Sequence, residues 1–301
     1  FKAIEVPTKF KTLSDLDPLI ELYHHTVRAG QYDEARTLFR DRISQATYYQ
    51  FGAYQLQIEL LSALFPDGED KPPRLKDESA QAWTLNELAN SYSLNGQPRK
   101  AVPLFERQIA IREKQGNKKN LAIGLGNVAG MAQIHIGALR SAEENLRRSI
   151  ELCREISDEF WEAVGHQELG RVLAYRGEWE EAERELTTAL GMFEKQNAAQ
   201  SQSVVWAYRA LRELLMLRSS VETLHDSPQS EAEWDATSLQ TDALNAARRA
   251  LELADEDARR VSPLELDYIR TYWLLGVAHR VNKNYDDAES HLLEALTRCR
   301  T

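Results

Sequence analysis

The chain has 301 residues, of which 43% are hydrophobic and 28% charged, and its formal net charge is −10. These fractions are ordinary for a folded globular protein. The acidic charge argues against a general nucleic-acid binder, which normally carries a basic face. A run of about 18 apolar residues, the length that spans a membrane, does not occur, so we expect neither nucleic acid nor membrane as a partner.

The residues 1–14 are expected to be extended, because they show no helical apolar stripe. Ser14 and Asp15 precede Leu16 as an N-terminal cap, and Pro18 suits the first turn, so a helix is predicted to about residue 28. Gly30 ends that helix, and its partner is predicted over 31–44.

An additional helix is expected at 47–65, followed by a Pro-containing loop over 66–77. Regular apolar periodicity then predicts helices at about 79–95, 97–115, 119–136, 138–156, 159–176, 178–196 and 200–218. The segment 219–236 is acidic, lacks a basic residue except His225 and contains Pro228, so it is predicted to be a solvated loop insertion. Helices are expected again at about 237–255, 263–282 and 284–300.

One short motif recurs along the chain: a turn, a spacer, a large residue, two further spacers and an alanine. Its alanines are Ala35, Ala101, Ala142, Ala182, Ala243 and Ala288. Where the extra helix and the acidic loop do not intervene, the interval is about 40 residues, which is typical of stacked helical hairpins. The sequence therefore predicts an all-α fold.

Close packing of the two helices in a hairpin requires small residues where the axes approach. The alanine of the motif supplies one of them, and Ala89, Gly130, Gly170 and Gly276 supply the other on the preceding helix. Tyr32, Trp179 and Tyr285, two residues after the turn, are expected to wedge between hairpins, and Phe39, Phe105, Leu146, Leu186 and Leu292 to be buried.

The pattern Leu169-Gly170, Leu173, Gly177, Trp179, Ala182, Leu186 and Ala189 resembles the tetratricopeptide repeat, as do Tyr272, Leu275-Gly276, Tyr285, Ala288, Leu292 and Ala295. The copy around Leu85–Phe105 is similar to kinesin-light-chain-type repeats. The long period resembles the C-terminal regulatory solenoids of STAND signalling ATPases. The resemblance implies a right-handed superhelical solenoid of stacked antiparallel helix pairs, here one domain over 15–301.

In this family the first helix of each hairpin lines a concave face that binds a protein or peptide partner. Carried over to this chain, the resemblance places Asn86, Asn90, Asn127, Met131, Gln167, Arg171, Tyr175, Arg212, Trp273 and Arg280 at its exposed positions. Asparagines there can grip a peptide backbone, and arginines can hold carboxylates. A solvated helix face or a contact between hairpins is the alternative for each residue.

Other motifs favour no chemistry. Gly124–Gly130 resembles a nucleotide loop but lacks the preceding strand, so helix packing is the better interpretation. The seven histidines form no metal-binding motif, and the acidic run at 178–185 is expected to be a solvated face with partners such as Arg184. Neither an acid–base set nor a cofactor motif is found, so an enzyme and a cofactor are not expected.

The function that these observations favour is an interaction scaffold or sensor module that binds a protein or peptide. The alternative is a free-standing receptor for a signalling peptide or small ligand. Two cysteines without metal-ligand spacing, Cys153 and Cys299, are typical of a reducing cytoplasm. Because the chain starts at Phe1, we expect it to be a fragment, with an upstream ATPase domain in the full-length chain if the STAND resemblance holds.

Overall fold

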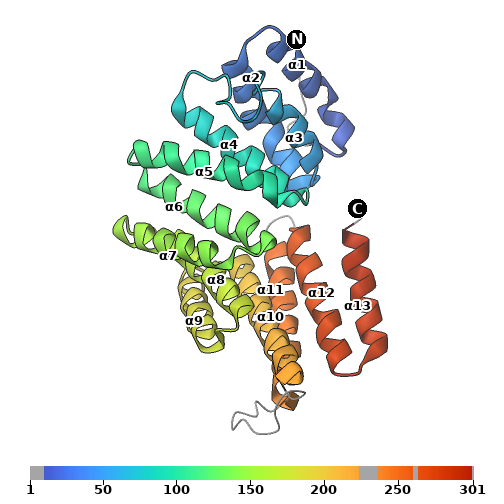
Figure 1. Cartoon of the computed structure of the whole chain (residues 1–301). Coiled ribbons are helices and arrows are strands. Elements are labelled where there is room, and N and C mark those ends of the chain that lie inside the picture. The colour runs from blue at the N-terminus through green and yellow to red at the C-terminus, as the bar shows by residue number, and fades with distance from the viewer. Residues whose placement is uncertain (1–9, 224–235, 260–263, 300–301) are drawn as a thin grey trace. The chain divides into compact units, whose positions relative to one another are not determined.

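A computed structural model describes residues 10–223, 236–259 and 264–299 (Figure 1). Throughout these ranges the regular structure is helical and no strand is present, which confirms the all-α prediction. The chain divides into two compact units, Phe1–Ala138 and Leu139–Thr301. A single solenoid over 15–301 stays a prediction.

The first unit begins with two helices joined at Gly30 and continues into paired helices. Its elements are η1 (Leu13–Leu16), α1 (Asp17–Arg28), α2 (Tyr32–Leu38), η2 (Phe39–Ile43), η3 (Ala46–Gln50), α3 (Tyr54–Ser62), α4 (Glu78–Leu94), α5 (Pro98–Lys114), α6 (Lys118–Asn127), η4 (Val128–Gln133) and η5 (Ile134–Ile136). Three of them, η2, η3 and η4, are π-helical, whereas η1 and η5 are 3-10 turns.

The prediction of one continuous helix over 47–65 is wrong. It is divided into η3 and α3 by a turn at Gly52, which has a φ of +56°, a conformation that favours glycine. The amide of Ala53 donates to the carbonyl of Thr47 across this turn at 2.7 Å. Of the predicted extended segment 1–14, residues 1–9 lie outside the described ranges, and Leu13 and Ser14 belong to the 3-10 turn η1.

A buried polar network fixes the segment 44–57 against α4. Gln57 is fully buried, and its amide nitrogen donates to Thr47 Oγ1 at 2.8 Å and to the carbonyl of Ser44 at 3.1 Å. Its amide oxygen accepts from Ser91 Oγ of α4 at 2.9 Å. Because every one of these groups finds a partner, the network gives the inserted segment one defined position.

The second unit consists of long helices connected by short turns. They are α7 (Leu139–Glu155), α8 (Glu159–Arg176), α9 (Trp179–Lys195), α10 (Ala199–Thr223), α11 (Ala236–Ala258), α12 (Glu265–Val281) and α13 (Tyr285–Arg298). The pairs α8–α9, α10–α11 and α12–α13 form hairpins (Figure 1). α10 extends five residues into the predicted acidic loop 219–236, of which residues 224–235 lie outside the described ranges.

The predicted packing positions explain why the hairpins close. All six motif alanines are at most 4% exposed. A Cβ added at Gly170 would lie 2.6 Å from Leu186 Cγ, and one at Gly276 would lie 2.5 Å from Leu292 Cγ. These glycines therefore let α8 approach α9 and α12 approach α13 more closely than any other residue would.

One aromatic position departs from the prediction. Tyr285 is 64% exposed, so it does not wedge between hairpins. Tyr32 and Trp179, at the same place in their repeats, are partly buried. Tyr285 starts α13, the last helix that the structure describes, and no later helix covers its ring there.

Candidate functional site

The predicted site residues of the first unit lie on α4, α6 and η4. Asn127 Nδ2 donates to Asn86 Oδ1 at 3.1 Å, and Asn86 Nδ2 donates to Glu87 Oε1 at 3.2 Å. Both asparagines are partly exposed. Residues one repeat apart are thus joined into a continuous polar row, Asn127–Asn86–Glu87, which crosses from one hairpin to the next.

Asn127 keeps unused hydrogen-bonding capacity within this row. A primary amide has two donors and an acceptor oxygen, and only one donor is engaged by a described residue. Met131 lies one turn further along, in the π-helix η4, and is partly exposed. Single π-helical turns inside α-helices occur frequently at functional sites.

Asn90 was predicted to be exposed, but the structure shows that it is buried. It is 7% exposed, and its Oδ1 atom is enclosed without a partner among the described residues. Asn90 follows Asn86 by one helical turn, and its side chain is enclosed. It can contact a partner only if its side chain turns outward.

The second unit has a compact polar cluster on α8, α10 and α12, each of which is the first helix of its hairpin. Glu168 pairs with Arg171 at 2.6 Å and accepts from the hydroxyl of Tyr208 at 3.0 Å. The guanidinium groups of Arg171 and Arg270 lie 5.0 and 5.5 Å from the centre of the Tyr208 ring. Burial raises the pKa of Tyr208 to about 12, so its hydroxyl stays a neutral donor.

The charges of this cluster are already compensated. Arg171 is paired with Glu168, and Arg270 lies 3.1 Å from Asp267, which also accepts from Gln200 at 2.8 Å. Gln167 is 7% exposed and donates to Glu168. These contacts link three consecutive hairpins, and they give Arg171 and Gln167 a structural task in addition to any contact with a partner.

Four predicted residues remain in this unit. Tyr175 and Trp273 are 43% and 46% exposed, and Arg280 is exposed. Arg212, predicted as exposed, is buried at 7% exposure, and its Nε donates to the carbonyl of Trp179 at 2.9 Å. α10 is covered by both α9 and α11, which is why Arg212 is enclosed.

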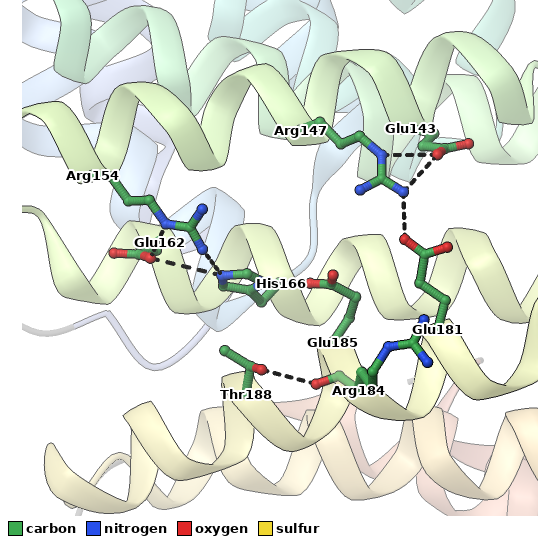
Figure 2. Close-up of polar contacts among 9 residues, drawn as sticks. All are labelled: Glu143, Arg147, Arg154, Glu162, His166, Glu181, Arg184, Glu185 and Thr188. Carbon is green, nitrogen blue, oxygen red and sulfur yellow. Dashed lines mark hydrogen bonds and ion pairs between the residues drawn. The ribbon is translucent and has the colours of Figure 1, made fainter.

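The acidic run on α9 is not merely solvated, because it binds neighbouring helices (Figure 2). Glu181 accepts from Arg147 of α7 at 2.7 Å. Glu185 contacts Nδ1 of the buried His166 of α8. Arg147 lowers the pKa of Glu181, and the predicted partner Arg184 contributes in the same direction. The backbone carbonyl of Arg184 also accepts from Thr188 at 2.9 Å (Figure 2).

Arg154 of α7 completes this network on the other edge of His166. It lies 2.6 Å from Glu162 and 3.0 Å from His166 Nε2. Both ring nitrogens of His166 are therefore engaged. The whole arrangement joins α7, α8 and α9, so we assign it to the stability of the hairpin stack.

Two features were missed by sequence reasoning. The first is Glu87 with the tyrosine cluster, by which we mean Tyr48, Tyr49 and Tyr54. The ring centres of Tyr48 and Tyr49 are 4.7 Å apart and those of Tyr48 and Tyr54 are 5.7 Å apart. The sequence did hold a signal for Glu87: no Lys or Arg occurs between residues 77 and 98, so Glu87 has no basic neighbour along its own helix.

The second missed feature is a pocket of about 390 Å³ among α11, α12 and α13. His279 and His291 stack there with ring centres 5.1 Å apart. His279 is 4% exposed, and desolvation lowers its pKa, with the nearby His291 and Arg248 acting in the same direction and Asp287 opposing them. Across the described ranges, no group of His, Cys, Asp and Glu side chains has an arrangement that could hold a metal ion.

The comparisons with known proteins agree with this architecture. Two models of the tetratricopeptide repeat match, one at residues 80–155 and one at 271–301. No curated protein matches the chain. Within the described part of the chain, none of the helices has the length and apolar character needed to cross a membrane.

Three solved structures are similar. The BtubC (BKLC) protein of P. vanneervenii is 17% identical, with 83% of this chain and 90% of that one covered at a TM-score of 0.51. A putative kinesin light chain of Podosopora anserina with nearly identical TPR-like repeats is 16% identical, with coverages of 74% and 97% and a TM-score of 0.48. A Rap protein complexed with Competence and Sporulation Factor is 13% identical, with coverages of 99% and 89% and a TM-score of 0.50.

The first and third of these structures show the fold. The matched ranges carry the anchor residues Ala101, Ala142 and Ala288, whose burial closes the hairpins. The chain therefore contains tetratricopeptide repeats, which are recognised at residues 80–155 and 271–301.

Proposed function

We propose that the chain is a binding module that recognises an extended peptide, or an extended segment of a protein partner, along the first helices of its repeats. The observation that carries this proposal is the row Asn127–Asn86–Glu87, in which side chains of consecutive hairpins are joined and partly exposed. An extended peptide presents N–H and C=O groups, which the unused donor and oxygen of Asn127 match.

The test selects ligands from a displayed library of random linear peptides on the immobilised full chain. Selected peptides are then titrated against the wild type, Asn127→Ala and Asn145→Ala, the last a matched control on the second helix α7. We expect affinity to fall about tenfold for Asn127→Ala only, since hydrogen bonds in an enclosed interface contribute on that order. The absence of saturable peptide binding, or equal binding by the two variants, would count against the proposal.

The other predicted residues are proposed to act within the unit to which each belongs, with different roles. Asn86 holds Asn127 in place, and Met131 supplies an adaptable apolar surface beside it. In the second unit Tyr175, Trp273 and Arg280 offer exposed aromatic and basic contacts. Asn90 in the first unit, and Gln167, Arg171 and Arg212 in the second, are proposed to support the exposed residues of their own unit from within the packing.

A receptor for a signalling peptide is the second candidate. The Rap protein of similar fold was solved in complex with Competence and Sporulation Factor. The exposed rings of Tyr175 and Trp273 favour this candidate, because aromatic side chains are preferred anchors for short ligands. Selection of short peptides that lose affinity for a Trp273→Ala variant would support it.

The place of the module in a signalling ATPase is a separate proposal, and it rests on the long repeat period. Sequencing of the full gene product tests it: a phosphate-binding loop upstream would support a STAND-type arrangement, and its absence would overturn that arrangement while leaving the binding module unaffected. We further propose a cytoplasmic setting, because Cys153 and Cys299 are thiols that form no disulfide in the described part of the chain.

A further inference from the structure

Glu87 is a carboxylate in a costly position. It lies in the middle of α4, beside the buried Leu88 and Ala89. Its described polar contact is the amide of Asn86 at 3.2 Å, and within the ranges that the structure describes no basic side chain pairs with it. A desolvated carboxylate without a cationic partner disfavours the folded state, unless a proton or a ligand cation compensates it.

The environment of Glu87 is suited to a cation. Burial raises the pKa values of Tyr48 and Tyr49, and the charge of Glu87 raises them further. Tyr48 meets Tyr49 and Tyr54 edge to face, at interplanar angles of 60° and 78°. The face of a tyrosine ring attracts a cation, and an adjacent carboxylate supplies the opposite charge.

The fold holds this cluster in one place while leaving it accessible. The turn at Gly52 separates η3, which carries Tyr48 and Tyr49, from Tyr54 at the start of α3. The buried Gln57 then fixes the segment against α4. Tyr49 is 66% exposed and Glu87 is partly exposed, so a ligand can reach both.

We propose that Glu87 and the tyrosine cluster bind the ammonium or guanidinium group of a basic side chain in the peptide partner. This inference rests on the proposed function, because Glu87 ends the row that starts at Asn127. A lysine or arginine of the peptide would place its charge at Glu87 and its aliphatic stem along the tyrosine rings. The site would thus select peptides that carry a basic residue at one position.

The test uses small probes in place of an unidentified peptide. Nα-acetyl-lysine methylamide and Nα-acetyl-arginine methylamide carry the charged side chain, and Nα-acetyl-norleucine methylamide is the uncharged control. Glycine methylamide carries only a main-chain ammonium and represents the amino terminus of a peptide. Binding to the full chain is followed by the NMR signals of isotope-labelled tyrosine rings. Single Tyr→Phe variants assign each signal to its residue.

We expect saturable shifts of the Tyr48, Tyr49 and Tyr54 rings with the two basic side-chain probes. The dissociation constant should rise about tenfold in Glu87→Gln and by a smaller factor in Tyr49→Leu. Glu106→Gln, which removes one exposed charge from α5, should bind as the wild type does. Circular dichroism of each variant confirms that its helices are retained.

The proposal is overturned if no probe gives saturable shifts, if norleucine methylamide binds equally, or if Glu87→Gln binds as the wild type does. Tighter binding of glycine methylamide than of the lysine and arginine probes would show that the site binds the amino terminus of a peptide. That result would overturn the proposal that it binds a basic side chain. Failure of the proposed function is distinguishable. It would appear as saturable probe binding at Glu87 with no peptide selected from the library.

Discussion

Leu186 packs so closely on Gly170 that a Cβ at position 170 would lie 2.6 Å from Leu186 Cγ and 3.2 Å from the carbonyl oxygen of Ala182. Gly276 is placed in the same way: a Cβ at position 276 would lie 2.5 Å from Leu292 Cγ and 3.1 Å from the carbonyl oxygen of Ala288. A contact repeated at the same place in two repeats shows that the hairpin interface is set by backbone approach at a glycine. This contact gives the first prediction.

Gly170→Ala should lower the free energy of unfolding by about 1–3 kcal/mol, because the added methyl group overpacks a closed interface. Gly191→Ala is the matched control in the partner helix α9, where an added Cβ meets nothing within 4 Å. That change should raise stability by up to about 1 kcal/mol, from helix propensity. Denaturant unfolding measures both, and equal effects of the two substitutions would refute the packing argument.

Gln57→Ala should destabilise the first unit by about 1–3 kcal/mol, since it leaves the buried Thr47 and Ser91 hydroxyls with fewer partners. Gln55→Ala, two residues earlier and exposed, is the control for loss of a glutamine from α3. The comparison is made by thermal unfolding of the full chain. Similar melting temperatures for the two variants would show that the network does not hold the inserted segment.

Glu87→Gln should change how stability depends on pH. Burial raises the pKa of Glu87 above its ordinary value of 4.5, so the folded state holds its proton more tightly than the unfolded state does. The stabilisation from this proton is complete below pH 4.5 and is lost as the pH rises through the raised pKa. The stability advantage of Glu87→Gln over the wild type should therefore grow with rising pH and then level off.

The control for this titration is Glu106→Gln, which removes the same charge from an exposed position. Unfolding free energies of the three proteins are measured by denaturant titration at a series of pH values. A constant difference between Glu87→Gln and the wild type across the series would contradict a desolvated Glu87 carboxylate that has no basic partner.

His279→Gln should remove a pH dependence of the opposite sign. Desolvation lowers the pKa of His279 below its ordinary value of 6.5, with Arg248 and the stacked His291 in support and Asp287 in opposition. The stability from the neutral ring is present above pH 6.5 and is lost as the pH falls through the lowered pKa. The measurement is the free energy of unfolding at a series of pH values, with His24→Gln, exposed on α1, as the control. If His279→Gln loses as much stability at acid pH as the wild type does, the role given to the neutral His279 ring is contradicted.

The repeat architecture could be predicted because its determinants are local in the sequence. Ala101, Gly170 and Ala182 recur at fixed spacings from a turn, and each is buried where predicted. The break at Gly52 could not be predicted because the apolar residues on either side of it, Phe51 and Tyr54, also suit a continuous helix. Only its positive φ in the structure shows that the chain turns there.

The site was less predictable because exposure depends on what covers a helix. The spacing that aligns Asn86 with Asn90 cannot show that one is partly exposed and the other enclosed. Arg212 is enclosed because α10 has neighbours on two sides, which its own sequence does not show. The tyrosine cluster requires packing of the inserted segment on α4, a tertiary contact between residues far apart in the chain.

The most direct measurement of the central claim, that the asparagine row grips a peptide backbone, combines Asn127→Ala with N-methylation of single peptide bonds in a peptide selected on the wild type. If Asn127 hydrogen-bonds the peptide backbone, methylation at one position should weaken binding to the wild type about tenfold and cause little further loss in Asn127→Ala. Equal losses in both proteins at every position would show that Asn127 does not contact the peptide backbone and would contradict the account.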